Sequence, residues 1–239
     1  MKKATLITGA SAGLGYEFAK LFAKDKHHLI LVARRKEKLE SIAQDLTRQF
    51  GIEVFVIAAD LANPQSSHLI FEQVIKLGLH VDHLVNNAGF GYVEAFVNAD
   101  LQKDTEMINV NVTSLVELTK LFAAKMVERK NGKILNIGST AGYQPGPYMA
   151  TYYATKAFVN SFSEALHHEL RHTGVSVTLS CPGPTLTEFG KRSGIDSKPL
   201  FKMSPATPQS VAMEAYSAMQ AGERRIIHGV QNGLGAIAA

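Results

Sequence analysis

The chain has 239 residues, a formal net charge of +4, and a composition that is 46% hydrophobic and 19% charged. These values are ordinary for a globular domain, and an α/β fold of this length commonly forms one unit. We therefore expect a single domain over residues 1–239. The basic residues are scattered in short clusters rather than gathered in one stripe, which argues against a nucleic-acid partner.

The cysteine content and the N-terminal residues indicate in which cellular compartment the protein is expected. Cys181 is the only cysteine and cannot form an intramolecular disulfide, which is typical of a reducing compartment. The apolar run after Lys2 and Lys3 is too short for a signal-peptide core, and no apolar stretch is long enough to span a membrane. We expect a soluble cytoplasmic protein with no membrane partner.

Seven short apolar runs are predicted to form strands, at residues 4–8, 29–33, 54–58, 83–86, 133–137, 175–180 and, more weakly, 224–228. Because the runs are nearly continuous in apolar residues, they indicate a parallel sheet covered on both faces. Segments with helical spacing lie between them, with apolar stripes at Phe18, Leu21 and Phe22, at Leu115, Leu118, Leu121 and Phe122, and at Phe158, Phe162, Leu166 and Leu170. The alternation predicts a doubly wound Rossmann-type α/β fold that binds ligands beyond the carboxyl ends of its strands.

Three glycines, Gly9, Gly13 and Gly15, follow the first strand at a strand-to-helix turn. Glycine lets backbone amides approach a diphosphate closely, and a helix N-terminus favours negative charge. The spacing differs from the commoner Gly-x-Gly-x-x-Gly fingerprint of dinucleotide sites. A tight turn that needs glycine only for its geometry is the alternative interpretation.

Two arginines, Arg34 and Arg35, end the second strand, and Lys38 follows closely. An NAD site commonly places a carboxylate here to bind the ribose 2′-hydroxyl, whereas an NADP site offers a cation to the 2′-phosphate. A solvated basic helix start is the alternative, but cations are unfavourable at a helix N-terminus. The sequence therefore predicts NADP(H) in preference to NAD(H).

Polar residues also follow the later strands. The pair Asp60-Leu61 and the run Asn86-Asn87-Ala88-Gly89 could each be a simple turn. Ser139 follows the fifth strand, and Tyr152 and Lys156 further on share one helical face. An ammonium group next to a tyrosine lowers its pKa, so Tyr152 could exchange a proton with an alkoxide to which Ser139 donates a hydrogen bond. A surface Tyr–Lys pair is the ordinary alternative.

Together and in this order, the motifs resemble those of the short-chain dehydrogenase/reductase family, from Thr5 to about Gly229. The resemblance implies that Tyr152 is the general acid/base, that Lys156 lowers its pKa and holds the nicotinamide ribose, and that Ser139 positions the substrate carbonyl. It also implies that Asn111, chosen over Asn109, anchors a water in a proton relay.

The resemblance further implies a cofactor site. Its residues would be Gly9, Ser11, Gly13, Leu14 and Gly15 at the diphosphate, Arg34 and Arg35 at the 2′-phosphate, Asp60 and Leu61 at the adenine, and Asn87, Ala88, Gly89, Tyr152, Lys156, Pro182, Gly183 and Thr187 toward the nicotinamide. No metal site is implied.

The segment 185–205 is rich in glycine and proline and is expected to be a substrate-binding loop. Nearby apolar residues predict an apolar or aromatic carbonyl or alcohol substrate, and the candidates are Phe90, Tyr92, Phe96, Tyr143, Tyr148, Tyr153, Leu186 and Phe189. The helices that carry Leu115 and Tyr152 resemble the dimer-forming pair of the family, so we expect a homodimer or homotetramer.

The predicted function is NADPH-dependent hydride transfer between the nicotinamide and a carbonyl/alcohol pair. One alternative is a non-catalytic NADP-binding sensor or scaffold on the same fold. The complete set of Asn111, Ser139, Tyr152 and Lys156 argues against it, because a binding protein does not need the acid. A second alternative is an epimerase or dehydratase that uses the same tyrosine.

Overall fold

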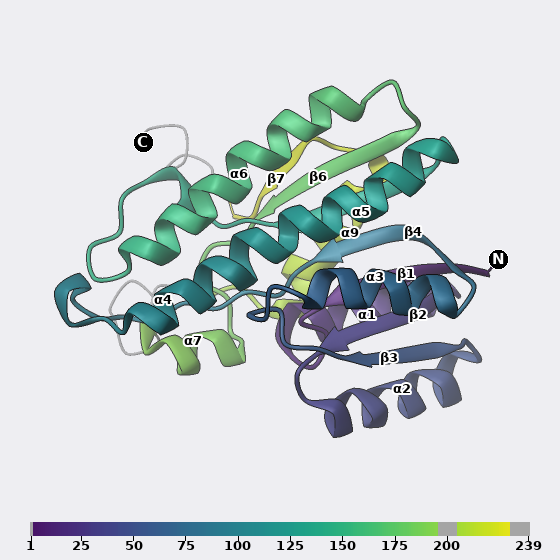
Figure 1. Ribbon diagram of the computed structural model, residues 1–239, viewed down its shortest axis with the longest axis horizontal. Coiled ribbons are helices and arrows are strands. Elements are labelled where there is room, and N and C mark those ends of the chain that lie inside the picture. Colours follow the sequence, from purple (N-terminus) through teal and green to yellow (C-terminus); the bar gives the residue numbers. More distant parts are fainter. Residues whose placement is uncertain (1, 196–204, 230–239) are drawn as a thin grey trace.

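The computed structural model describes residues 2–195 and 205–229. Within them, seven parallel strands form one sheet in the order β3-β2-β1-β4-β5-β6-β7 (Figure 1). The strands are β1 (Lys2–Thr8), β2 (His28–Ala33), β3 (Val54–Ala58), β4 (Leu79–Asn86), β5 (Gly132–Ile137), β6 (Val175–Cys181) and β7 (Arg225–Ile227). The predicted strands and the doubly wound α/β fold are confirmed, and the differences lie at strand ends.

Helices cover both faces of this sheet (Figure 1). They are α1 (Gly13–Lys24), α2 (Lys36–Phe50), α3 (Ser66–Lys76), α4 (Leu101–Ile108), α5 (Ser114–Glu128), α6 (Ala150–Leu170), α7 (Glu188–Ser193) and α9 (Pro208–Ala221), with shorter turns at η1 (Phe96–Asn98), η2 (Asn109–Thr113) and η3 (Thr140–Tyr143). Helices α1, α2 and α9 pack on one face, and α3, α5 and α6 pack on the other. None of the described helices is long and apolar enough to cross a membrane.

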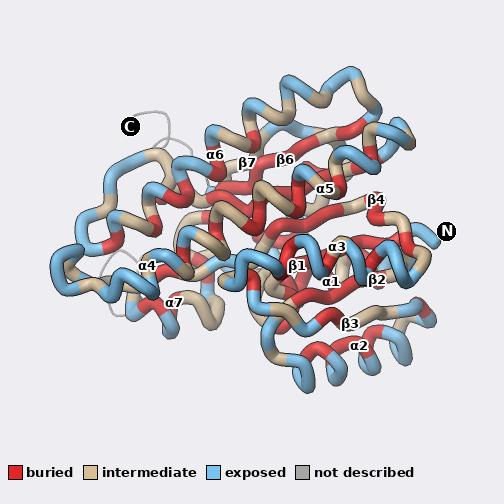
Figure 2. Tube along the Cα trace, in the orientation of Figure 1, coloured by how far each residue is buried: buried red, intermediate tan, exposed pale blue. Residues whose placement is uncertain are grey.

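The first core lies between the sheet and α1, α2 and α9. Phe18 and Phe22 of α1 are fully buried there against Leu31 and other strand residues. Burying such a side chain contributes roughly 1.5–3 kcal/mol. The central strands of the sheet and the inner sides of its helices are mostly buried, the edge strands β3 and β7 are mostly half-buried, and the outer sides of the helices are exposed (Figure 2). The stripe predicted for α1 therefore faces the core as expected.

Helix α6 departs from the prediction. Leu166 and Leu170 pack partly buried on the second core, but Phe158 is 44% exposed and stacks on Phe162 with ring centroids 5.7 Å apart. The buried face of the helix is instead mostly polar and comprises Tyr152, Thr155, Lys156, Val159, Asn160 and Ser163. The reason is that this face meets the carboxyl end of the sheet, where polar side chains find hydrogen-bond partners.

The chain reverses its direction across the sheet between β3 and β4. Strand β3 is at one edge, and β4 returns to pair with the other side of β1, with Ile7 opposite Val85. In open α/β sheets such a switch point leaves a crevice at the carboxyl ends of the two diverging strands. The loops that follow β1 and β4 are therefore brought together there.

Candidate active site

A cavity of about 480 Å³ lies at this switch point, beyond the carboxyl ends of the strands. It brings together most of the predicted site: Gly9, Ser11, Gly13, Leu14, Arg34, Arg35, Asp60, Leu61, Asn87, Ala88, Gly89, Ser139, Tyr152, Lys156, Pro182, Gly183 and Thr187. Gly15 and Asn111 do not line it, and both are buried. Segments that are distant in the sequence thus converge on one site.

The glycine turn after β1 packs tightly against the loop after β4. Gly9 has a φ of +65°, and a Cβ there would lie 2.8 Å from Nδ2 of Asn87. A Cβ at Gly15 would collide with the carbonyl oxygen of Gly9. Helix α1 begins directly after this turn, and among the described residues no side chain caps it and no acidic residue lies in its first turn. Its first N–H groups are therefore available to an anion.

Thr8 and Asn87 join these two loops. The Thr8 Oγ1 accepts hydrogen bonds from the backbone N–H groups of Asn87 and Ala88, each at 3.0 Å. The side-chain Nδ2 of Asn87 donates to the Thr8 carbonyl at 2.8 Å. Asn87 thus lines the cavity, but its amide group holds the glycine turn in place.

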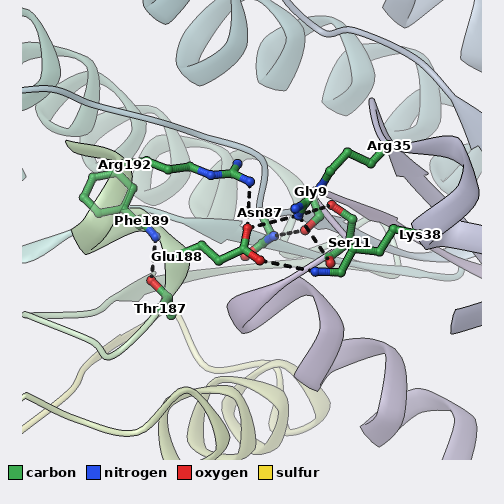
Figure 3. Close-up of polar contacts among 9 residues, drawn as sticks. All are labelled: Gly9, Ser11, Arg35, Lys38, Asn87, Thr187, Glu188, Phe189 and Arg192. Carbon is green, nitrogen blue, oxygen red and sulfur yellow. Dashed lines mark hydrogen bonds and ion pairs between the residues drawn. The ribbon is translucent and has the colours of Figure 1, made fainter. Parts of the chain in front are cut away.

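The outer end of the cavity is cationic. Arg35 donates from Nη2 to the Oγ of Ser11 at 3.0 Å and to a carboxylate oxygen of Glu188 at 3.1 Å (Figure 3). Arg34 is more exposed and lies 3.8 Å from Asp60. Glu188 was not predicted as a site residue, because no local sequence pattern indicates a contact between residues 153 positions apart.

The inner end is buried and holds the predicted catalytic groups. Tyr152 and Lys156 are 9% and 6% exposed. The ammonium group of Lys156 donates to the carbonyl of Ile137 at 2.8 Å and lies 5.9 Å from the centre of the Tyr152 ring. Burial lowers the pKa of Lys156 to about 8. The group is therefore mainly protonated at neutral pH.

The predicted lowering of the Tyr152 pKa is not what the structure gives. Burial raises the pKa of Tyr152 to about 12, and the hydrogen bond with Ser139 opposes this rise without outweighing it. Lys156 does not offset the burial, because its ammonium group is turned to the Ile137 carbonyl. Tyr152 is therefore a neutral phenol, which is a proton donor.

Ser139 is held in place by Asn160, one helical turn after Lys156. The Nδ2 of Asn160 donates to the Ser139 carbonyl at 3.0 Å, and its Oδ1 accepts from the Ser139 N–H at 3.4 Å. The Ser139 Oγ accepts from the backbone N–H of Ala141 at 3.0 Å. Asn160 was also missed from the sequence, although its spacing from Lys156 puts it on the same helical face.

Asn111 lies in the π-helical turn η2 behind the catalytic end. Its Nδ2 donates to the Phe90 carbonyl at 2.9 Å and to Thr155 at 3.0 Å, and its Oδ1 accepts from the Phe90 N–H. A Cβ on Gly89 would lie 3.2 Å from that Oδ1 and 3.6 Å from the Lys156 Nζ. Asn109 instead donates to the carbonyl of Ala62. Of the two asparagines, Asn111 lies nearer the lysine.

Known proteins share both the sequence and the architecture of this chain. The family model described as short chain dehydrogenase matches residues 3–198. The chain belongs to the short-chain dehydrogenase family. A very-long-chain 3-oxoacyl-CoA reductase of Anas platyrhynchos is 39% identical over 207 residues, which make up 84% of this chain and 65% of that protein. Its Homo sapiens counterpart is 33% identical over 235 residues, which are 96% of this chain and 73% of that protein.

Among solved structures, a short-chain dehydrogenase from Sphingobium yanoikuyae in complex with NADPH has a TM-score of 0.89 and 32% identity. The similarity covers 100% of this chain and 92% of that one. The predicted family and its enzyme class, oxidoreductases that act on CH–OH and C=O groups, are therefore confirmed.

The cavity of this short-chain dehydrogenase fits a nicotinamide dinucleotide. The glycine turn and the uncapped start of α1 suit a diphosphate, and the cations at the outer end suit a further phosphate. Among the described residues, no cluster of His, Cys, Asp or Glu could hold a metal ion. The lining residues therefore fit a nicotinamide cofactor of the kind that this family uses.

The predicted substrate-lining residues separate into groups. Phe90, Tyr153 and Phe189 line the main cavity, and Tyr92, Phe96 and Tyr148 line a smaller adjoining hollow. Tyr143 does neither, because it packs under α6 with its hydroxyl 3.5 Å from the sulfur of Cys181, and Leu186 is 54% exposed. In the predicted loop 185–205, residues 188–193 form α7, and residues 196–204 lie outside the described residues.

Proposed function

We propose that this short-chain dehydrogenase is an NADPH-dependent reductase of carbonyl groups on apolar substrates, with the alcohol oxidation as its reverse. One observation carries the proposal. The neutral phenol of Tyr152, paired with Ser139, lies at the buried end of the same cavity whose outer end is lined by Arg34 and Arg35. A proton donor and a group of cations suited to a phosphate thus line the same cavity.

NADPH, when bound, supplies the hydride that adds to the carbonyl carbon. Tyr152 donates its phenolic proton to the carbonyl oxygen, which completes the alcohol. The hydroxyl of Ser139 donates a hydrogen bond to the same oxygen as its negative charge develops. The ammonium of Lys156, held by the Ile137 carbonyl, stabilises the phenolate that remains. A water anchored by Asn111 would link Lys156 to solvent and so supply the proton that returns to Tyr152.

The preference for NADPH rests on the outer end of the cavity. A carboxylate that would bind a ribose 2′-hydroxyl is absent from the end of β2, where Arg34 and Arg35 stand instead. Arg35 lies against the glycine turn through Ser11, so its guanidinium is close to where the adenosine ribose would lie. The NADPH complex of the Sphingobium relative supports this choice.

The substrate proposal rests on the aromatic residues near Tyr152. Phe90, Tyr153 and Phe189 offer an apolar surface, and the Phe189 ring lies 5.4 Å from the Tyr152 ring. The names of the curated relatives point to 3-oxoacyl thioesters with long apolar chains. The matched region spans about two thirds of the duck protein, so we take this substrate class as a proposal for the present chain.

We further propose a homodimer or homotetramer built on α5 and α6, and a cytoplasmic location. The stacked and partly exposed Phe158 and Phe162 on α6 support the assembly. The free, buried Cys181 supports a reducing compartment. A monomeric mass by light scattering would contradict the assembly.

The test is consumption of NADPH and of NADH with a panel of 3-oxoacyl thioesters of increasing chain length, bulky ketones and small charged ketoacids. We expect turnover with NADPH that increases with chain length or apolar bulk. Preference for the charged ketoacids would contradict the substrate class, and preference for NADH would contradict the cofactor. Nucleotide binding without turnover on any member would contradict the reductase.

A further inference from the structure

The carboxylate of Glu188 lies at the outer end of the cavity among three cations (Figure 3). Its Oε2 accepts from Arg35 at 3.1 Å and from Arg192 at 2.7 Å, and its Oε1 accepts from Lys38 at 3.2 Å. Glu188 begins α7, whereas Arg35 and Lys38 belong to the start of α2. The contact therefore bridges the cofactor cavity between two elements that are distant in sequence.

Glu188 uses the donors that a 2′-phosphate would need. Carboxylate and phosphate oxygens accept the same charge-assisted hydrogen bonds from guanidinium and ammonium groups. Arg35 binds both Ser11 and Glu188 through the same nitrogen, Nη2, so a phosphate that binds this nitrogen competes directly with Glu188. A phosphate on the ribose would therefore compete with Glu188 for Arg35 and Lys38.

Because the cluster is partly exposed, replacing Glu188 by a phosphate costs little free energy. The side chains of Arg35, Lys38 and Glu188 are 39%, 43% and 40% exposed. Ion pairs at such positions are individually weak, whereas a phosphate monoester carries nearly two negative charges at neutral pH. Partial burial alone would raise the pKa of Glu188, but the hydrogen bonds from Lys38 and Arg35 hold it below its usual value. Glu188 is therefore an anion that a stronger anion can displace.

The third cation gives Glu188 a partner after such an exchange. Arg192 lies one turn further along α7 and is already bound to the carboxylate. Glu188 can therefore leave α2 without becoming an unpaired charge. Only the link between the two helices is lost, and the ion pair within α7 remains.

The first turn of α7 also reaches the catalytic end. Phe189, the next residue, packs on the ring of Tyr152. Thr187, the residue before, caps α7 through its Oγ1, and its side chain would lie 3.2 Å from a Cβ on Gly13. The two neighbours of Glu188 in the chain therefore contact the glycine turn and the catalytic tyrosine, so a movement of Glu188 can affect both contacts.

We propose that Glu188 is an internal competitor for the 2′-phosphate pocket, so that a nucleotide with this phosphate displaces it from Arg35 and Lys38 and frees α7 from α2. Glu188 thereby moderates the discrimination between NADP(H) and NAD(H) and links the cofactor type to the position of α7. This inference rests on the proposed NADPH preference.

The experiment compares adenosine 2′,5′-bisphosphate with adenosine 5′-monophosphate by calorimetry, because the two differ only in the 2′-phosphate. In Glu188→Gln we expect the bisphosphate to bind about three- to tenfold more tightly than in the wild type, as for the loss of one or two competing exposed ion pairs. The monophosphate should bind equally to both proteins. Glu128→Gln is the matched control, because Glu128 is 61% exposed on α5 and pairs with Lys125.

A second readout follows α7 directly. Hydrogen exchange of the amides in residues 188–193 should become faster when the wild type binds the bisphosphate, but not when it binds the monophosphate. In Glu188→Gln these amides should exchange fast before any nucleotide is added. Unchanged exchange in the variant would contradict the link between α2 and α7.

The outcomes separate this inference from the proposed cofactor preference. If both proteins favour the bisphosphate to the same degree, the competition is wrong and the NADPH preference stands. Weaker bisphosphate binding in Glu188→Gln would mean that Glu188 orients Arg35, which also overturns the competition. If neither protein distinguishes the two nucleotides, the NADPH preference itself is wrong.

Discussion

The two ends of the cavity are built on opposite principles. At the catalytic end, Tyr152 and Lys156 are 9% and 6% exposed, and Lys156 is bound to a backbone carbonyl of β5. At the outer end, the side chains of Arg34 and Arg35 are 67% and 39% exposed, and their ion-pair partners Asp60 and Glu188 are partly exposed as well. One end is fixed by the backbone, whereas the other is held together by charges that water can also reach.

This difference shows what each end can contribute. Preorganised, buried groups stabilise a developing charge without rearrangement, so they suit catalysis. Exposed charges are weak individually and can be exchanged, so they suit recognition of a ligand that must bind and leave at every turnover. We therefore expect substitutions at the catalytic end to act on rate and those at the outer end to act on cofactor affinity.

Tyr152→Phe should show the largest difference between an effect on rate and an effect on cofactor affinity. Removal of the hydroxyl deletes the proton donor, and general acid catalysis is worth on the order of 10²–10⁴ in rate. We expect the single-turnover rate of reduction to fall by about 10³-fold, with NADPH affinity within about twofold of the wild type. Tyr153→Phe is the matched control, since Tyr153 also lines the cavity but has no lysine four residues further along α6. Equal losses in the two variants would remove Tyr152 from its role.

Arg35→Ala probes the other end. Hydrogen bonds to charged groups contribute about 1.5–3 kcal/mol, so NADPH should bind about 10–100-fold more weakly. NADH lacks the 2′-phosphate, and its affinity should change by less than about twofold. Titration of each cofactor by fluorescence or calorimetry measures both values. A loss that is shared equally by NADH would place Arg35 at the diphosphate instead.

The pH dependence of reduction separates the two buried ionisable groups. Tyr152 keeps its proton to about pH 12, whereas Lys156, with its pKa lowered to about 8, carries its charge below that pH and loses it above. We expect kcat/KM for reduction to be level below about pH 8 and then to fall, by up to tenfold per pH unit. A profile that stays level to pH 10 would mean that the Lys156 charge is not needed.

Much of this fold could be predicted because its signals are local. Each strand is a short, nearly continuous apolar run, and the glycine turn and the Tyr152–Lys156 pair stand at fixed distances after their strands. The apolar stripe of α6 predicted the wrong buried face. The face that is buried carries Lys156 and Asn160, which belong to the site, rather than leucine and phenylalanine. Hydrophobic periodicity finds core-facing helix surfaces, and it fails where a helix buries polar groups.

Asn160 and Glu188 were not predicted from the sequence for a different reason. Asn160 acts through the loop that carries Ser139, and Glu188 acts on Arg35 from across the cavity. Neither contact has a sequence spacing of its own, because each depends on how separate elements are brought together in space. The raised pKa of Tyr152 has the same origin, since burial and the direction of the Lys156 side chain are properties of the folded chain.

Arg34→Ala gives the smallest expected effect, and it distinguishes the contribution of Arg34 to NADPH affinity from that of Arg35. Arg34 is the more exposed of the two arginines and lies 3.8 Å from the Asp60 carboxylate, which is beyond hydrogen-bond distance, so it contributes a diffuse charge rather than a fixed donor. We expect NADPH affinity to fall by less than about threefold, in line with exposed ion pairs, and the loss to vanish at high salt. The Arg35→Ala loss should persist there in part, because Arg35 is held by Ser11. If Arg34→Ala cost more than Arg35→Ala, the 2′-phosphate would lie on the Asp60 side of the cavity, away from Glu188.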